Sequence, residues 1–143
     1  MRDFTIFLYG IFFIICYLIR QQKESVVIMA QYKHLPIYKL TYDILLKIMH
    51  VTKNFPRDYK YTLGQKLKDE TIELIIMIYK ANSSKDKAQD IETILENIQV
   101  IQLLIRLSHD IKILPRKQYA DIAEKVDSLG RQAQGWLKSS GKR

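Results

Sequence analysis

Glycine and proline are scarce in this sequence, which has five glycines and three prolines among 143 residues. All-β folds depend on many turns, so this scarcity favours a few long helices over many short strands. With 48% hydrophobic and 27% charged residues, the chain is too apolar for a disordered protein. Its composition and length suit one domain with its own core.

Residues that carry catalysis or bind metals are also few. The single cysteine, Cys16, excludes an intramolecular disulfide, and no Cys/His spacing typical of a zinc site is present. His34, His50 and His109 are scattered, without carboxylates at ligand spacing. Asp110 adjoins His109, but adjacent helical residues point about a quarter turn apart. We therefore expect no enzyme activity, no metal and no cofactor.

Basic residues outnumber acidic ones, giving a formal net charge of +8 and a pI of about 9.5. Residues 1–28 contain three basic and two acidic residues, so residues 29–143 retain +7. This excess predicts attraction to polyanions, such as nucleic acid or an anionic membrane, without choosing between them.

The first 28 residues differ from the rest. Residues 4–19 form a run of 16 uncharged residues between Arg2 and Arg20, shorter than the ~20 residues that a membrane span needs. No convincing signal-peptide cleavage site follows it. We interpret residues 1–28 as an extension from an over-extended start, with the folded domain over residues 29–143. A membrane anchor is the alternative.

The remaining chain carries apolar residues at every third or fourth position in four segments, the spacing of amphipathic helices. It predicts helices over 36–55, 62–81, 85–113 and from about 119 to the Ser139-Ser140-Gly141 stretch. Pro56 disfavours helical geometry at Phe55, and Thr62 is expected to cap the next helix with Gln65 as its capping-box partner. Three short connections and no strand signal predict an all-α, antiparallel up-down-up-down four-helix bundle. The predicted core positions are Ile37, Leu40, Ile44, Ile48, Val51, Phe55, Leu63, Leu67, Leu74, Ile78, Ala81, Ile91, Ile94, Ile98, Ile101, Ile105, Tyr119, Ile122, Val126, Leu129, Ala133 and Trp136.

The second and third helices have more apolar surface than one core uses. The additional residues are Ile72, Ile75, Ile76, Tyr79, Val100, Leu104, Leu107 and Ile111. Full burial of an aliphatic side chain contributes about 1.5 to 3 kcal/mol, so a homo-oligomer or a protein partner is expected to cover them. The alternative is a broad core whose rim is covered by lysine stems.

Basic residues gather near two of the connections between helices. In the predicted bundle these connections lie at one pole, which would bring together Arg57, Lys60, Lys66, Lys112, Arg116 and Lys117. We expect this pole to bind a polyanion, because pooled charges create a field that interspersed charges do not. An ordinary solvated surface is the alternative. Arg106 interrupts an apolar run, a position typical of contact with a phosphate, a carboxylate or another subunit.

Three segments together resemble one family. They are Phe55-Pro56-Arg57 followed by Lys60-Tyr61-Thr62-Leu63-Gly64-Gln65, then Leu103-Leu104-Ile105-Arg106-Leu107 followed by Lys117-Gln118-Tyr119, and Leu129-Gly130-Arg131 followed by Gly135-Trp136-Leu137-Lys138. In order and spacing they resemble the Avd proteins, the accessory variability determinants of diversity-generating retroelements. These are related to the four-helix proteins encoded in 23S ribosomal RNA intervening sequences.

The resemblance implies a cytoplasmic, non-catalytic protein that forms a homopentameric barrel of basic four-helix protomers. Such a barrel would bind the element's reverse transcriptase and template RNA and support mutagenic cDNA synthesis and retrohoming. The resemblance places Arg106 and Arg131 on the surface that meets polymerase or nucleic acid, and Arg57 in the polar joint. One departure is Gln102, where some members have a second basic residue.

Three alternatives remain open at this stage. The first is an intervening-sequence-type bundle of obscure role. The second is a membrane-anchored helical interaction module, which would require residues 1–28 to be translated and inserted. The third is a small regulatory protein, such as a toxin or antitoxin, that binds a protein partner without salt-sensitive RNA affinity.

Overall fold

The computed structural model describes residues 10–20 and 35–141, which belong to two separate units divided between His34 and Leu35. Residues 10–20 are helical. Within the described ranges, no helix has the length and apolar character needed to cross a membrane. The predicted boundary at residues 28 and 29 lies outside the described residues.

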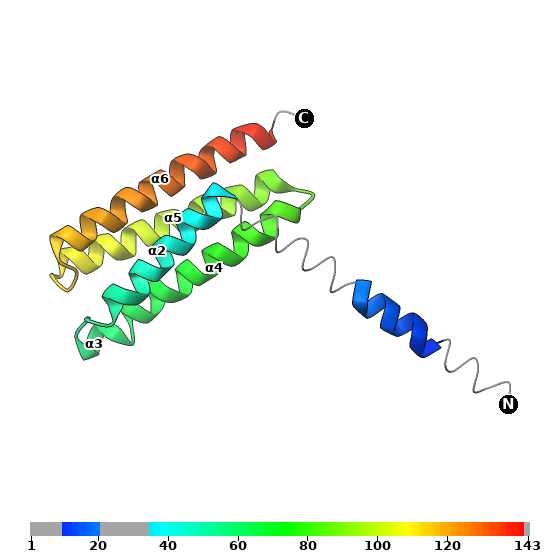
Figure 1. Cartoon of the computed structure of the whole chain (residues 1–143). Helices are drawn as coiled ribbons and strands as arrows, with labels where there is room; N and C mark the ends of the chain where they lie inside the picture. Colours follow the sequence, from blue (N-terminus) through cyan, green and yellow to red (C-terminus); the bar gives the residue numbers. More distant parts are fainter. Residues whose placement is uncertain (1–9, 21–34, 142–143) are drawn as a thin grey trace. The chain divides into compact units, whose positions relative to one another are not determined.

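The second unit is a helical bundle, which confirms the predicted all-α class. Its elements are α2 (Pro36–Thr52), α3 (Arg57–Lys60), α4 (Leu63–Ser83), α5 (Lys87–Asp110) and α6 (Arg116–Ser140). Residues 35–141 contain no strand. The long helices pack around a common centre, with α2 against α4 and α6, and α5 also against α4 and α6 (Figure 1).

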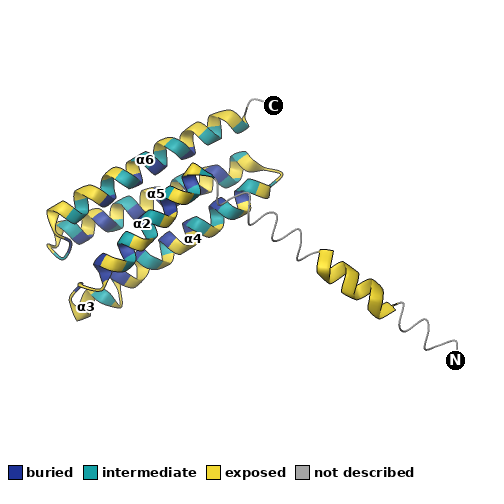
Figure 2. Cartoon of the chain, viewed as in Figure 1, coloured by how far each residue is buried: buried dark blue, intermediate teal, exposed yellow. Residues whose placement is uncertain are grey.

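The core follows the predicted apolar spacing. All but four of the 22 predicted core positions are buried, and every long helix turns a buried stripe inward and an exposed face outward (Figure 2). The four others, Leu40, Leu63, Tyr119 and Trp136, are half-buried. Leu114, which lies between α5 and α6, is a buried residue that the pattern missed.

Hydroxyl groups inside the bundle are satisfied by their own helices. The buried Thr41, Thr71 and Ser108 each donate to the carbonyl oxygen four residues earlier, at 2.7, 2.7 and 2.8 Å. A buried hydroxyl without a partner would be costly. This local bonding explains how polar residues sit on the inward stripes.

Two ion pairs join α2 to α6 and show their relative direction. Lys47 pairs with Asp121, and Asp43 pairs with Lys125 at 2.7 Å. Four residues forward in α2 correspond to four residues backward in α6, so the two helices run in opposite directions. The end of α2 therefore lies near the start of α6.

Several predicted boundaries were wrong by a few residues. The first helix ends at Thr52 rather than Phe55, and the short α3 was not predicted. The third helix begins after Asp86, whose side chain accepts a hydrogen bond from the Gln89 amide at 3.4 Å, and it ends at Asp110. The fourth begins directly after Pro115, because proline suits the start of a helix.

The predicted capping box at Thr62 was also wrong. Thr62 precedes α4 but makes no side-chain cap. Its hydroxyl instead donates to the Asp58 carbonyl at 2.9 Å, which the unpredicted α3 brings within reach. The Gln65 side chain donates to Asp69 rather than turning back toward the amide of residue 62.

The surplus apolar surface on α4 and α5 is present in the structure. Of the eight residues predicted to form it, Ile72, Ile76, Val100, Leu107 and Ile111 are exposed, whereas Ile75, Tyr79 and Leu104 are half-buried. Leu103, 64% exposed, belongs with them and was not predicted. The exposed Val100, Leu103 and Leu107 of α5 and Ile111 directly after it form one stripe, because their spacing is three or four residues.

The pairs between α2 and α6 predict a pH dependence of stability. The hydrogen bond from Lys47 lowers the pKa of Asp121 below its ordinary value of 3.8. A lowered carboxyl pKa stabilises the fold above the ordinary value, and this stabilisation disappears as the pH falls through the lowered one. We expect Asp121→Asn to lower the melting temperature at pH 7 but to match the unmodified protein near pH 2.

The Asp121→Asn comparison is made by thermal unfolding across this pH range at low salt. Asp127→Asn, on the same helix, provides a control for a general effect of charge removal. Equal effects of the two substitutions at every pH would contradict the assigned role of the Lys47 pair.

Candidate nucleic-acid interface

The joint between α2 and α4 is held by a close approach of the backbone. Phe55 is buried, and the buried Gly64 lies against it. A Cβ at position 64 would lie 3.3 Å from Phe55 Cδ2 and 3.4 Å from the Tyr59 carbonyl oxygen. The absence of a side chain at Gly64 therefore lets α4 begin directly beneath this joint.

The short helix α3 carries basic residues on the outside of the joint. Arg57 is exposed in its first turn. Lys60 donates to the carbonyl oxygen of Lys53 at 3.1 Å and so satisfies a carbonyl at the end of α2. Lys53 is itself exposed. It is a basic residue of this end that was not predicted from the sequence. Its position near the end of the first helical pattern could have placed it here.

The turn from α5 to α6 closes the helix with a Schellman motif. The Lys112 amide donates to the His109 carbonyl at 2.9 Å, and the Ile113 amide donates to the Ser108 carbonyl at 3.1 Å. Lys112 has a φ of 64°, in the left-handed region where glycine is usual. A lysine there costs about 1 kcal/mol or more.

Aromatic packing further fixes this turn. The His109 ring lies 4.4 Å from the Tyr119 ring, nearly parallel to it, and His109 Nδ1 lies 3.1 Å from the Leu114 carbonyl oxygen. Leu114 is buried beneath them. These contacts give His109 a structural role at the end of α5.

The start of α6 carries positive side chains, whereas negative side chains at this position would stabilise the helix. Arg116 and Lys117 occupy its first turn, which has no acidic residue, and Pro115 makes no side-chain cap. The N-terminus of a helix carries a positive partial charge and free amide donors. The cationic side chains add to this charge, so the first turn of α6 is strongly electropositive.

Five of the predicted basic residues lie at the two connections that share one end of the bundle. The joint containing α3 and the turn from α5 to α6 are both at this end, and the turn from α4 to α5 lies at the other (Figure 1). Arg57, Lys60, Lys112, Arg116 and Lys117, together with Lys53, define what we call the basic end. Asp58 and Asp110 lie among them, so the end has mixed charges with a basic excess.

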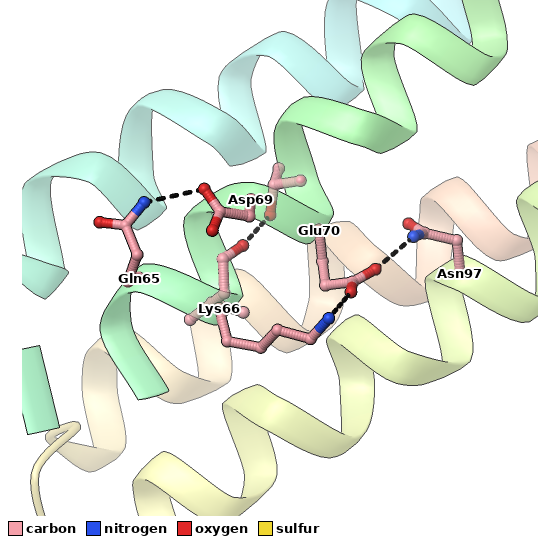
Figure 3. Close-up of polar contacts among 7 residues, drawn as sticks. Gln65, Lys66, Asp69, Glu70 and Asn97 are labelled. Carbon is pink, nitrogen blue, oxygen red and sulfur yellow. Dashed lines mark hydrogen bonds and ion pairs between the residues drawn. The ribbon is translucent and has the colours of Figure 1, made fainter. Parts of the chain in front are cut away.

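Lys66 differs from these residues because its charge is compensated. It forms an ion pair with Glu70, and Glu70 accepts a hydrogen bond from Asn97 of α5 at 2.6 Å (Figure 3). The hydrogen bond to Glu70 raises the pKa of Lys66. Lys66 thus belongs to a polar contact between α4 and α5, and we expect it to contribute less than its neighbours to binding of an anion.

The two remaining predicted residues lie along the helices. Arg106 is exposed and contacts Asp110 over 3.8 Å, a long and solvated pair of little energetic weight. Arg131 is exposed in the second half of α6, fifteen residues beyond Arg116 and so away from the basic end. Among the described residues, Arg57, Lys112, Arg116, Lys117 and Arg131 form no ion pair.

A shallow pocket between α2 and α6 contains carboxylates, but both are engaged. Asp43 and Asp121 line it together with His50 and Gln118, and each carboxylate pairs with a lysine. Within the part of the chain that the structure describes, no three His, Cys, Asp or Glu side chains could hold a metal ion.

Together, the fold and this end define an all-α bundle protein with an electropositive end. A protein-family profile described as bAvd-like matches residues 35–140, which include every helix from α2 to α6. The chain therefore belongs to the bAvd-like family, and the resemblance seen in the sequence is confirmed. No curated protein matches the sequence.

The strained lysine of the turn predicts opposite effects on stability and binding. Lys112→Gly should stabilise the protein by about 1 kcal/mol in urea unfolding, because glycine adopts a positive φ without steric cost. Lys112→Ala is the matched control, since it removes the same charge and keeps a Cβ at the strained position. If the lysine serves a binding role, both substitutions should weaken polyanion binding equally. Equal stability of the glycine and alanine variants would contradict the assigned strain.

Proposed function

We propose that this protein is a non-catalytic accessory protein of a diversity-generating retroelement. It would bind the element's reverse transcriptase and its template RNA and support mutagenic cDNA synthesis and retrohoming. The observation that carries the proposal is the match of the bAvd-like family over the whole bundle. The basic end and the exposed apolar stripes supply surfaces suited to the two kinds of contact.

The proposed assembly is a homopentamer of antiparallel four-helix protomers. Its support within the chain is the exposed stripe formed by Val100, Leu103 and Leu107 of α5 and by Ile111 directly after it. Contiguous apolar surface of this kind marks protein contacts. Each aliphatic residue that becomes fully buried in a contact would contribute about 1.5 to 3 kcal/mol.

The proposed RNA contacts use cations that are not neutralised within the chain. Arg116 and Lys117 lie at the electropositive start of α6, where backbone amide donors and basic side chains can bind the same phosphate. Arg57 and Lys112 extend this surface, whereas Arg106 and Arg131 form a second set along the helices. The second set is the proposed contact with the polymerase or with a further stretch of nucleic acid.

The proposed assembly predicts the mass of the protein in solution. Light scattering after size exclusion should give about five times the 16.9 kDa chain mass for the unmodified protein. Leu103→Asp should reduce this mass to that of the single chain without loss of helicity, because a charge is desolvated in any contact that buries position 103.

Gln134→Asp is the matched control for that substitution, because it adds the same charge to an exposed position of α6, on a different helix from the stripe. It should leave the assembly intact. A single-chain mass for the unmodified protein would contradict the pentamer, and a pentamer that survives Leu103→Asp would contradict the proposed use of this stripe.

RNA affinity tests the proposed contacts residue by residue. Arg116→Ala, Arg106→Ala and Arg131→Ala should each weaken binding of a structured RNA at low salt. Each should also reduce the slope of log affinity against log salt by about one unit. The reason is that each phosphate contact releases about one counterion on binding, and the variant has lost one such contact. Fluorescence anisotropy with labelled RNA, at several salt concentrations, measures both quantities.

Two lysines provide internal controls for the RNA measurement. Lys80→Ala makes the same charge change on an exposed residue near the other end of the bundle and should have a smaller effect. Lys66→Ala should also have a smaller effect than Arg116→Ala, since Glu70 already compensates Lys66. Equal losses for all five variants would show a diffuse charge effect and contradict the assigned contacts.

A further inference from the structure

The helix over residues 10–20 exposes almost its whole apolar surface. Its large side chains include Ile11, Phe12, Phe13, Ile14, Ile15, Leu18 and Ile19, all of which are exposed. Phe12 and Phe13 expose 68% and 79% of their surface. Exposure of apolar surface to water costs about 25 cal/mol for each Å². The segment is therefore more stable in an apolar environment.

The arrangement of these residues indicates what kind of surrounding fits. Successive helical residues are rotated by about 100°, so the consecutive Ile11, Phe12, Phe13 and Ile14 point to four different sides. A protein groove accepts one apolar face of an amphipathic helix and leaves a polar face in water. A helix that is apolar on every side suits surroundings that enclose it, such as lipid chains.

Charge and length support the same surrounding. The uncharged residues 4–19 lie between Arg2 and Arg20, and basic residues at the ends of an apolar segment can reach lipid headgroups. The uncharged run of 16 residues is shorter than the ~20 residues that a membrane-spanning helix needs. Insertion into one leaflet therefore fits it better than crossing the bilayer.

We propose that the helix over residues 10–20 inserts into one leaflet of a lipid bilayer and attaches the protein to a membrane. The bundle is a separate unit, and the attachment is proposed independently of its function. The attachment is hydrophobic, so it differs from the salt-sensitive attraction of a basic protein to anionic lipid.

Vesicle flotation with the full chain tests this directly. The full chain should float with vesicles of neutral phosphatidylcholine, and 0.5 M salt should not release it. Binding that requires anionic lipid and disappears at 0.5 M salt would show that basic residues carry it and would overturn the proposal. Absence of binding to both kinds of vesicle would overturn it equally.

A matched pair of substitutions separates this helix from the exposed apolar residues of the bundle. Phe13→Asp should lower the partition coefficient into neutral vesicles by more than roughly tenfold, because a carboxylate is costly within the hydrocarbon layer. Leu46→Asp introduces the same charge at another highly exposed apolar residue, on α2 of the bundle and outside the stripe proposed for assembly, and should change the coefficient less than twofold. The reverse order would assign the membrane contact to the bundle and overturn the proposal.

The single cysteine provides a probe at the proposed site. Cys16 is exposed within this helix, so a polarity-sensitive dye can be attached there without other substitutions. The dye emission should shift to the blue when neutral vesicles are added, and nitroxide groups on the lipid chains should quench it. The same blue shift without vesicles, dependent on protein concentration, would show that a second copy of the chain covers the helix and would overturn the proposal.

Discussion

Burial of aliphatic side chains between four long helices is the interaction on which the bundle depends. Twelve large side chains are less than 2% exposed, and all but one of them lie on inward helical positions. Full burial of each contributes about 1.5 to 3 kcal/mol, against which backbone ordering costs a comparable total. The ion pairs between α2 and α6 are solvated and add little, but they are consistent with one direction and register.

A core of this kind can support unfavourable features at its ends. Lys112 occupies a conformation that glycine adopts more easily, and Arg116 and Lys117 face the positive end of a helix. Each feature costs on the order of 1 kcal/mol. Both occur at the same end of the molecule, in residues that make no ion pair within the described part of the chain. Stability alone favours glycine and acidic residues there, so both features are consistent with the binding role that we propose for this end.

Sequence periodicity predicted the long helices and most of their buried residues, because burial on one face of a helix repeats every three or four positions. It failed at the connections. The unpredicted α3 has only four residues, too few to show a helical period. Its presence brings the Asp58 carbonyl within reach of the Thr62 hydroxyl, which therefore does not cap α4. The left-handed Lys112 could not be anticipated because its residue type argues against that conformation.

The candidate site, like the fold, was predicted only in part from the sequence. Charge counting identified the basic residues, but only the structure shows that Glu70 compensates Lys66 and that Lys60 bonds to the Lys53 carbonyl. These partners lie four and seven residues away in the sequence. At such separations the sequence offers several possible partners for each lysine and does not show which one is used. A basic residue contributes to a polyanion site in proportion to its uncompensated charge. We therefore expect Arg116 and Lys117 to contribute more than Lys66 to the proposed polyanion binding.

Apolar surface in this chain has two different forms, and the difference constrains its partners. The stripe on α5 is narrow and borders exposed polar residues such as Gln99 and Arg106, as expected for contact with another folded surface. Residues 11–14 instead place large apolar side chains on every side of one helix, which a folded surface could cover only by enclosing it. One chain therefore carries a surface suited to assembly and a segment suited to lipid, and their separation into different units allows each to act without the other.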